Sequence, residues 1–259
     1  MPHDGFALIT GASRGLGMAF ARALAERHYN LVLVARSADS LDAFAAELRR
    51  SHQVEVLAIH FDLACPGAGQ ILAEQLSAAG VPIELLVNNA GFGLRGDFRA
   101  LSLHQQLEML HLNNHAIVEL TYSLLPDMLQ RPQKGIINIS STAGFQPIPY
   151  ASAYCATKAF LTTFSLALEQ ELRASGATVV TVCPGRLYKL HASDSVKPLP
   201  RKFPGIHHTA DFVVRDALRV LANGGGLSVP GVLNKFSVFA QRFIPRRVIP
   251  RLVATMSKP

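Results

Sequence analysis

The chain alternates short, almost entirely apolar runs with longer segments in which apolar residues recur every three or four positions. The apolar runs lie at Phe6–Ile9, Leu31–Ala35, Val54–Ile59, Ile83–Val87, Gly135–Ser140, Thr178–Val182 and Leu227–Val229. The helix-like segments lie at Gly15–Arg27, Ser40–Arg50, Gly69–Ala79, Leu103–Gln130, Ala153–Ser175 and Asp211–Ala222. Because a strand that is apolar throughout is buried on both faces, this alternation predicts an α/β fold. We expect a doubly wound parallel sheet of about seven strands with helices on both faces.

The last part of the chain follows a different pattern. Residues 231–259 mix apolar and basic side chains, with six bases and no acid, and Pro245 and Pro250 interrupt them. Since proline breaks a helix, we expect two or three short helical pieces rather than one long helix. We therefore divide the chain into one domain, residues 1–230, and a basic amphipathic tail, residues 231–259. The tail either lies on an anionic membrane surface or packs against the domain or a second subunit.

The charge and the cysteine content limit the class of protein and the compartment in which we expect it. The chain has 259 residues and a formal net charge of +7, most of which belongs to the tail. A nearly neutral body with no recognisable basic recognition helix excludes a general nucleic-acid-binding protein. Three cysteines without metal-site spacing predict reduced thiols and a cytoplasmic protein, peripheral on the inner membrane face if the tail binds lipid. We predict no metal site, because the pair His111 and His115 lacks a third ligand.

A glycine-rich turn joins the first predicted strand to the first predicted helix. It spans residues 10–17 and places glycine at Gly11, Gly15 and Gly17. Glycine lets the backbone turn tightly and approach a pyrophosphate, whose charge then faces the N-terminus of the helix. In this strand–turn–helix context the motif predicts a Rossmann-type dinucleotide-binding domain.

Further motifs follow in order along the chain. They are Asn88-Asn89-Ala90-Gly91, Ser141, Tyr154 with Lys158, and Pro184-Gly185. Together with the G-x-x-x-G-x-G spacing of the turn, they make the sequence similar to the compact branch of the short-chain dehydrogenase/reductase family over residues 5–230. The resemblance implies that the dinucleotide contacts Gly11, Ser13, Arg14, Gly15, Leu16, Gly17, Arg36, Asp62, Asn89, Ala90, Gly91, Tyr154, Lys158, Pro184 and Gly185.

The end of the second strand indicates which dinucleotide is preferred. NAD-dependent enzymes place an acid near this point to bind the ribose hydroxyls, whereas this chain has Ala35 followed by Arg36. Arg36 and Arg14 suit the 2′-phosphate of NADP, although both could be solvated surface residues. Asp62 matches the family's adenine-contacting aspartate, and it could also act as a cap.

The predicted catalytic residues lie at the same sheet edge. Tyr154 and Lys158 are four residues apart and share one helix face, so the ammonium could lower the pKa of the phenol and make it an acid or base at neutral pH. Ser141 ends the fifth strand, where its hydroxyl could hydrogen-bond a substrate oxygen, with Ser140 as its rival. The resemblance implies a fourth member, Asn113, although Asn114 is adjacent.

The resemblance implies hydride transfer between NADP(H) and a carbonyl or alcohol carbon, with Tyr154 as the general acid or base. Apolar loops around Phe92 and Phe145 favour a hydrophobic ketone or aldehyde. The family also implies a homodimer or homotetramer. Lys189 stands where the family has a threonine that contacts the nicotinamide amide, which leaves open a non-catalytic relative that only binds the dinucleotide.

Overall fold

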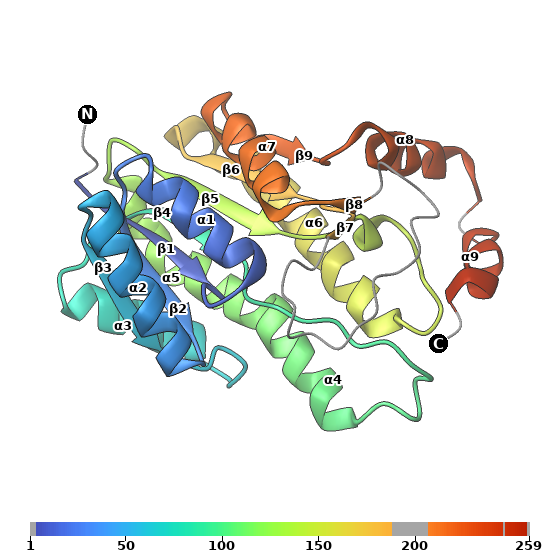
Figure 1. Cartoon of the computed structure of the whole chain (residues 1–259). Helices are drawn as coiled ribbons and strands as arrows, with labels where there is room; N and C mark the ends of the chain where they lie inside the picture. The colour runs from blue at the N-terminus through green and yellow to red at the C-terminus, as the bar shows by residue number, and fades with distance from the viewer. Residues whose placement is uncertain (1–3, 188–206, 246, 258–259) are drawn as a thin grey trace.

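The computed structural model describes residues 4–187, 207–245 and 247–257, and a parallel sheet runs through its middle (Figure 1). The strands are β1 (Phe6–Thr10), β2 (Asn30–Ala35), β3 (Val56–His60), β4 (Ile83–Asn88), β5 (Gly135–Ile139), β6 (Thr178–Val182) and β9 (Gly226–Ser228). Their order is β3-β2-β1-β4-β5-β6-β9, and every neighbouring pair is parallel. The seven-stranded, doubly wound sheet predicted from the sequence is confirmed.

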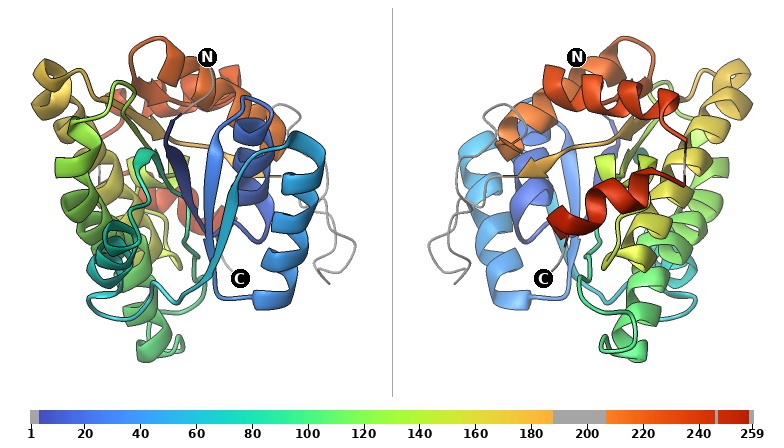
Figure 2. Two further views of the ribbon diagram at one scale, coloured as in Figure 1. Left: turned by 90° about the vertical axis from the view of Figure 1, so that its left-hand side faces the viewer. Right: turned by 90° about the vertical axis from the view of Figure 1, so that its right-hand side faces the viewer.

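Helices cover both faces of the sheet, as the two end-on views in Figure 2 show. One face carries α1 (Gly15–Ala25), α2 (Ala38–His52) and α7 (Ala210–Ala222). The other carries α3 (Ala68–Ala78), α5 (Ala116–Leu129) and α6 (Ser152–Leu172). Side chains such as Phe20 on the first face and Leu72 on the second are fully buried against the strands. This two-sided burial explains why the strands are apolar at nearly every position.

The segment expected to form one helix over residues 103–130 is interrupted. It consists of α4 (Leu103–Leu110), a π-helical turn (His111–His115) and α5. A π turn accommodates one extra residue and is frequent at functional sites. Hydrophobic periodicity does not reveal such a turn, because the apolar faces on either side of it are preserved.

The order of the strands reverses between β2 and β4, which both pair with β1. In an open α/β sheet, the crevice beyond the carboxyl ends of the strands at this reversal is where ligands bind. The turns after β1, β4 and β5 all meet at that edge. The motifs singled out in the sequence are therefore brought to one place.

The chain after β9 forms α8 (Val232–Ala240), a 3-10 turn (Gln241–Phe243) and α9 (Ile249–Ser257), in agreement with the expected short pieces. Two short strands, β7 (Arg186–Leu187) and β8 (His207–His208), form a separate parallel pair. Within the described ranges, no helix combines the length and apolarity needed to cross a bilayer.

Candidate active site

The glycine turn between β1 and α1 has the geometry that its sequence predicts. Gly11 and Gly15 adopt positive φ angles of +66° and +57°, which disfavour residues with a Cβ atom. Gly17 is required for a different reason, because a Cβ atom there would lie 2.1 Å from the Gly11 carbonyl oxygen. The turn can therefore close only with glycine at these positions.

Asn89 braces this turn from the neighbouring strand. Its Nδ2 donates to the carbonyl oxygens of Thr10, at 2.8 Å, and Gly11, at 3.1 Å. The Thr10 hydroxyl oxygen in turn accepts from the backbone N–H groups of Asn89, at 3.0 Å, and Ala90, at 2.9 Å. Thr10 was not identified from the sequence, where it reads as the last residue of a strand. Asn89, expected to contact the dinucleotide, is here a residue that positions the glycine turn.

The N-terminus of α1 has room for an anion. Its N-cap residue, Arg14, is extended and makes no side-chain cap hydrogen bond. Apart from the adjoining residues and the backbone of the helix itself, no atom of the described residues lies within 4 Å of where a Gly15 Cβ atom would stand. A pyrophosphate could lie in that open space against the first backbone N–H groups of the helix. The residues present therefore fit a dinucleotide. Leu16 is buried beneath the turn, and Ser13 is half-buried.

The expected 2′-phosphate site is open and loosely held. Arg36 follows β2, its side chain is 63% exposed, and its Nη1 lies 3.9 Å from Oδ2 of Asp62. The other carboxylate oxygen of Asp62 accepts from the backbone N–H of Ala64 at 3.0 Å. Asp62 thus closes the turn after β3, and it is not the helix cap that was the alternative, because the N-cap of α3 is Gly67. Arg14 is also exposed.

The two serines at the end of β5 differ in burial, since Ser140 is buried and Ser141 is half-buried. Ser140 is buried, and its hydroxyl donates to the Lys158 carbonyl oxygen at 2.9 Å and contacts the Thr162 hydroxyl at 2.7 Å. Ser141 begins a 3-10 turn (Thr142–Phe145), accepts from the Ala143 N–H at 3.1 Å and forms a side-chain hydrogen bond with Tyr154. Of the two serines, Ser141 is the one paired with the phenol.

Tyr154 and Lys158 project from α6 into the same region. Lys158 is buried, its Nζ donates to the Ile139 carbonyl oxygen at 2.8 Å, and it lies 6.0 Å from the centroid of the Tyr154 ring. Burial lowers the pKa of Lys158 to about 8. Burial also raises the pKa of Tyr154, while its hydrogen bond with Ser141 acts in the opposite direction.

The direction of the Tyr154 shift differs from the expectation that the ammonium lowers the phenol pKa. The cost of burying a phenolate is the larger effect, and Lys158 is directed at a backbone carbonyl instead. The phenol is thereby kept protonated in the chain alone. This is the form needed to donate a proton.

The π turn places Asn113 opposite Lys158. Its Nδ2 donates to the Phe92 carbonyl oxygen at 3.0 Å and to the Thr157 hydroxyl at 3.1 Å, and its Oδ1 accepts from the Phe92 N–H at 3.2 Å. A Cβ atom on Gly91 would lie 2.7 Å from that Oδ1 and 3.7 Å from Nζ of Lys158. Asn114 instead donates to the Thr157 carbonyl oxygen at 3.0 Å, so Asn113 is the one that faces the lysine.

Two further residues support this cluster. Thr157 donates its hydroxyl to the Tyr154 carbonyl oxygen at 2.7 Å while accepting from Asn113, and so connects two helices. A Cβ atom on Gly93 would lie 2.9 Å from Cδ2 of Tyr154, so glycine lets the loop after β4 pack on the ring. Thr157 could have been noticed in the sequence, since it lies between Tyr154 and Lys158. Nothing in the sequence indicated that it pairs with Asn113.

The Pro184-Gly185 segment closes the site after β6. The Pro184 carbonyl oxygen accepts from the Thr142 N–H at 3.0 Å, and a Cβ atom on Gly185 would lie 2.6 Å from Nδ2 of Asn234 in α8. The tail therefore packs directly behind this loop. Lys189, the departure from the family pattern, lies outside the described residues. In the described parts of the chain, no group of three or more His, Cys, Asp or Glu side chains could hold a metal ion.

A parallel sheet with a glycine turn at its reversal and a Ser–Tyr–Lys cluster at the same edge defines a dinucleotide-dependent oxidoreductase. The short chain dehydrogenase family profile matches residues 5–195, and the chain belongs to this family, whose members act on the CH–OH and C=O pair. A ketoacyl reductase from Nostoc sp. is 36% identical over 216 residues, which cover 83% of this chain and 75% of that protein.

Two other proteins extend the comparison. The human very-long-chain 3-oxoacyl-CoA reductase is 32% identical over 206 residues, covering 76% of this chain but only 65% of the human protein. The solved structure of a short-chain dehydrogenase from Sphingobium yanoikuyae in complex with NADPH is 31% identical, with a TM-score of 0.79. That match covers 92% of this chain and 93% of the other.

Proposed function

We propose that the protein is an NADPH-dependent reductase of hydrophobic carbonyl compounds, and that 3-oxoacyl thioesters are the first class to test. The observation that carries the proposal is the hydrogen-bonded pair of Ser141 and Tyr154 beside the buried Lys158. The curated relatives support the substrate class, because one is a ketoacyl reductase and another a 3-oxoacyl-CoA reductase.

The reaction adds a hydride to the carbonyl carbon and a proton to its oxygen. When bound, NADPH supplies the hydride. Ser141 and Tyr154 both hydrogen-bond the substrate oxygen, and Tyr154 gives up its phenolic proton as negative charge develops there. Lys158 stabilises the resulting phenolate through its charge, and Asn113, facing it across Gly91, orders the path by which the proton is replaced. The Tyr154 phenol is protonated before the reaction, and because burial raises its pKa, the charge of Lys158 must offset the cost of the buried phenolate as the proton leaves.

The preference for NADPH rests on charge at the end of β2. Ala35 leaves no acid to repel a 2′-phosphate, and Arg36 and Arg14 are exposed and able to approach one. Arg36 is only weakly engaged with Asp62, at 3.9 Å, so it can turn toward a phosphate without losing a strong ion pair. The NADPH complex of the Sphingobium protein is consistent with this choice.

We also infer a homodimer or homotetramer in the cytoplasm. Apolar side chains are exposed along α4, α5 and α6, at Leu103, Leu107, Val118, Tyr122 and Phe160. Such a run of exposed apolar residues on neighbouring helices suits a subunit contact.

The test is NADPH oxidation by the purified protein with 3-oxoacyl thioesters of increasing chain length and with simple hydrophobic ketones, each repeated with NADH. We expect turnover with NADPH on at least one of these substrates and a loss of about 1000-fold in Tyr154→Phe, which retains the ring but removes the proton. A protein that binds NADPH but shows no turnover on any substrate would instead be the non-catalytic relative. Equal rates in Tyr154→Phe would contradict the assigned role of the tyrosine.

A further inference from the structure

The helix α8 and the 3-10 turn that follows it have two faces of opposite character. Val238 and Asn234 are buried, with 7% and 4% exposure. On the other side, Val232, Phe236, Phe239 and Phe243 are 81%, 68%, 55% and 74% exposed. Their spacing of four, three and four residues places them on one side of the helical segment. Three phenylalanines in a row on a solvent-exposed face are costly unless something covers them.

The buried face fixes the segment on the domain. Val238 packs in a small cluster with Cys183, Val229 and Phe145, and Asn234 donates to the Pro230 carbonyl oxygen at 2.8 Å. The apolar stripe formed by Val232, Phe236, Phe239 and Phe243 therefore stays exposed, with Phe239 at its edge, beside a pocket that it lines together with Val238. Of the alternatives considered from the sequence, packing against the domain applies to one face of α8, and the other face remains exposed.

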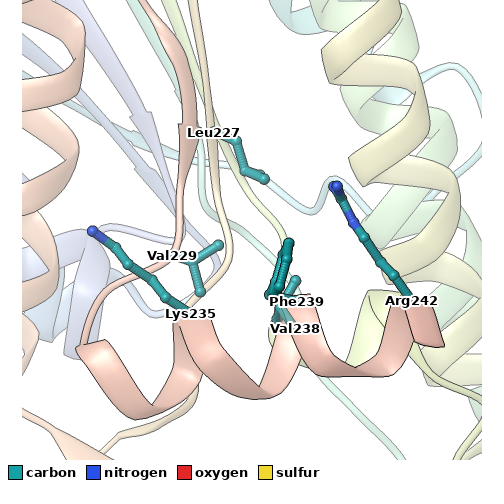
Figure 3. Close-up of a pocket in the computed structure, with 6 residues that line it drawn as sticks. All are labelled: Leu227, Val229, Lys235, Val238, Phe239 and Arg242. Atoms are coloured by element: carbon teal, nitrogen blue, oxygen red, sulfur yellow. The ribbon is translucent and has the colours of Figure 1, made fainter. Parts of the chain in front are cut away.

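Basic side chains accompany this stripe. Figure 3 shows Lys235, Phe239 and Arg242 extending from one side of α8 toward Leu227 and Val229, where they line a shallow pocket of about 230 Å³. Arg247 and Arg251 are also exposed. From Gly231 to the end of the sequence there is no acidic residue.

The combination of exposed aromatic and basic side chains favours a lipid surface as the partner. Aromatic side chains beside lysine and arginine, on a helix that lies flat on a domain, suit the boundary between lipid headgroups and acyl chains. Each base near an anionic surface adds attraction to the lipid phosphates. A second copy of the chain is a poorer partner, because a two-fold contact through this face would bring the same bases together without an acid to pair them.

We propose that the apolar stripe of α8 and its flanking bases dock the protein peripherally on an anionic lipid surface. The helix that carries this stripe lies beside the candidate active site, since its buried Val238 belongs to the cluster on which Phe145 packs, in the turn that begins at Ser141. The inference does not depend on the reaction catalysed, and its test measures binding alone.

The experiment is co-sedimentation of the full chain with vesicles of phosphatidylcholine alone and of phosphatidylcholine with phosphatidylglycerol. We expect binding to the anionic vesicles that weakens as salt is raised. The double variant Phe236→Ser with Phe243→Ser should reduce binding at least tenfold, whereas Ile71→Ser, a 47% exposed position on α3, should leave it unchanged.

Charge is tested separately. Arg242→Glu with Arg251→Glu should remove the preference for anionic vesicles, and Arg50→Glu, at an exposed position on α2, should retain it. Lys235 is left intact because its charge acts on the Asp216 carboxylate of α7. Circular dichroism and NADPH binding would verify that each variant is folded.

Four results would overturn the proposal. The first is a wild-type chain that does not sediment with anionic vesicles above the protein-only control, and the second is equal binding to neutral vesicles. The Phe236 and Phe243 variant could instead bind as the wild type does. Finally, light scattering could show that the wild type is an oligomer and that this variant is a smaller species. The stripe would then be a contact between copies of the chain.

Discussion

Two regions that face the same crevice are held in very different ways. In the proposed catalytic cluster, Asn113 makes three hydrogen bonds, and Lys158 is buried with its Nζ hydrogen-bonded to a carbonyl oxygen. At the other end of the crevice, Arg14 is exposed and Arg36 has one long ion pair, at 3.9 Å, on a side chain that is 63% exposed.

The difference reflects what each region has to do. Proton transfer depends on groups held in position before the reaction begins, and the side chains proposed to be catalytic are fixed by their neighbours in this way. A phosphate can be bound by long guanidinium side chains that close on it as it arrives. We therefore expect substitutions in the cluster to change kcat and substitutions of the arginines to change the KM for the cofactor.

The largest effect should come from Lys158→Met, which keeps the length of the side chain and removes its charge. We expect kcat to fall roughly 1000-fold, because nothing then stabilises the Tyr154 phenolate. The variant should fold, since the charge that it removes is buried and desolvated. Steady-state kinetics with NADPH would measure the loss, and a fall of less than tenfold would place the lysine outside the chemistry.

A smaller effect should distinguish the two adjacent asparagines. Asn113→Ala and Asn114→Ala each remove buried hydrogen bonds, so each should lower the free energy of unfolding by about 1–3 kcal/mol. Only Asn113→Ala should also reduce kcat, by roughly 100-fold. Urea denaturation and kinetics on the same two proteins make the comparison, and equal kcat losses would remove the special role of Asn113.

The exposed arginine should give a still smaller effect that is confined to one cofactor. Arg36→Ala should raise the KM for NADPH about tenfold, the loss of one charge-assisted contact, and leave the KM for NADH unchanged. Arg50→Ala, on the exposed surface of α2, is the matched control. A parallel change with both cofactors would show that Arg36 does not contact the 2′-phosphate.

The last effect is on stability alone and concerns the cost of burying Lys158. Its pKa is about 8 in the folded chain and 10.5 in its ordinary state, so between these values the folded chain binds fewer protons there than the unfolded chain. The free energy of unfolding should therefore gain a contribution that rises with pH from 8 to 10.5, by at most about 1.4 kcal/mol per pH unit. The Lys158→Met variant should lack this contribution. If the free energy of unfolding changes with pH in the same way in both proteins, the lowered pKa of the buried Lys158 would be contradicted.

The sheet could be predicted from the sequence because each of its strands is buried on both faces and leaves a strong local pattern. The glycine turn could also be predicted, because the spacing of Gly11, Gly15 and Gly17 is typical of a turn that binds a dinucleotide. The proximity of Tyr154 and Lys158 could be predicted because a helix brings residues four apart onto one face.

What escaped prediction depends on contacts between distant parts of the chain. The bond between Asn113 and Thr157 joins residues 44 positions apart. Inside the sheet, Asn88 donates to Asn138 at 2.8 Å, and Asn138 donates to Ser165 at 2.8 Å, a polar row that no local pattern marks. The direction of the Tyr154 pKa shift also depends on burial, which spacing along a helix does not report.

The π turn at His111–His115 contains one residue more than a regular α-helical turn would need to join α4 to α5. Deleting one residue within it would turn the wide i to i+5 turn into an ordinary i to i+4 turn, while α4 and α5 would keep their present faces toward the core. Such a chain would still fold and still offer its glycine turn to a dinucleotide. It would lose the amide that faces Lys158. We therefore expect such a deletion to lower kcat about as much as Asn113→Ala does, while the fold and dinucleotide binding are retained.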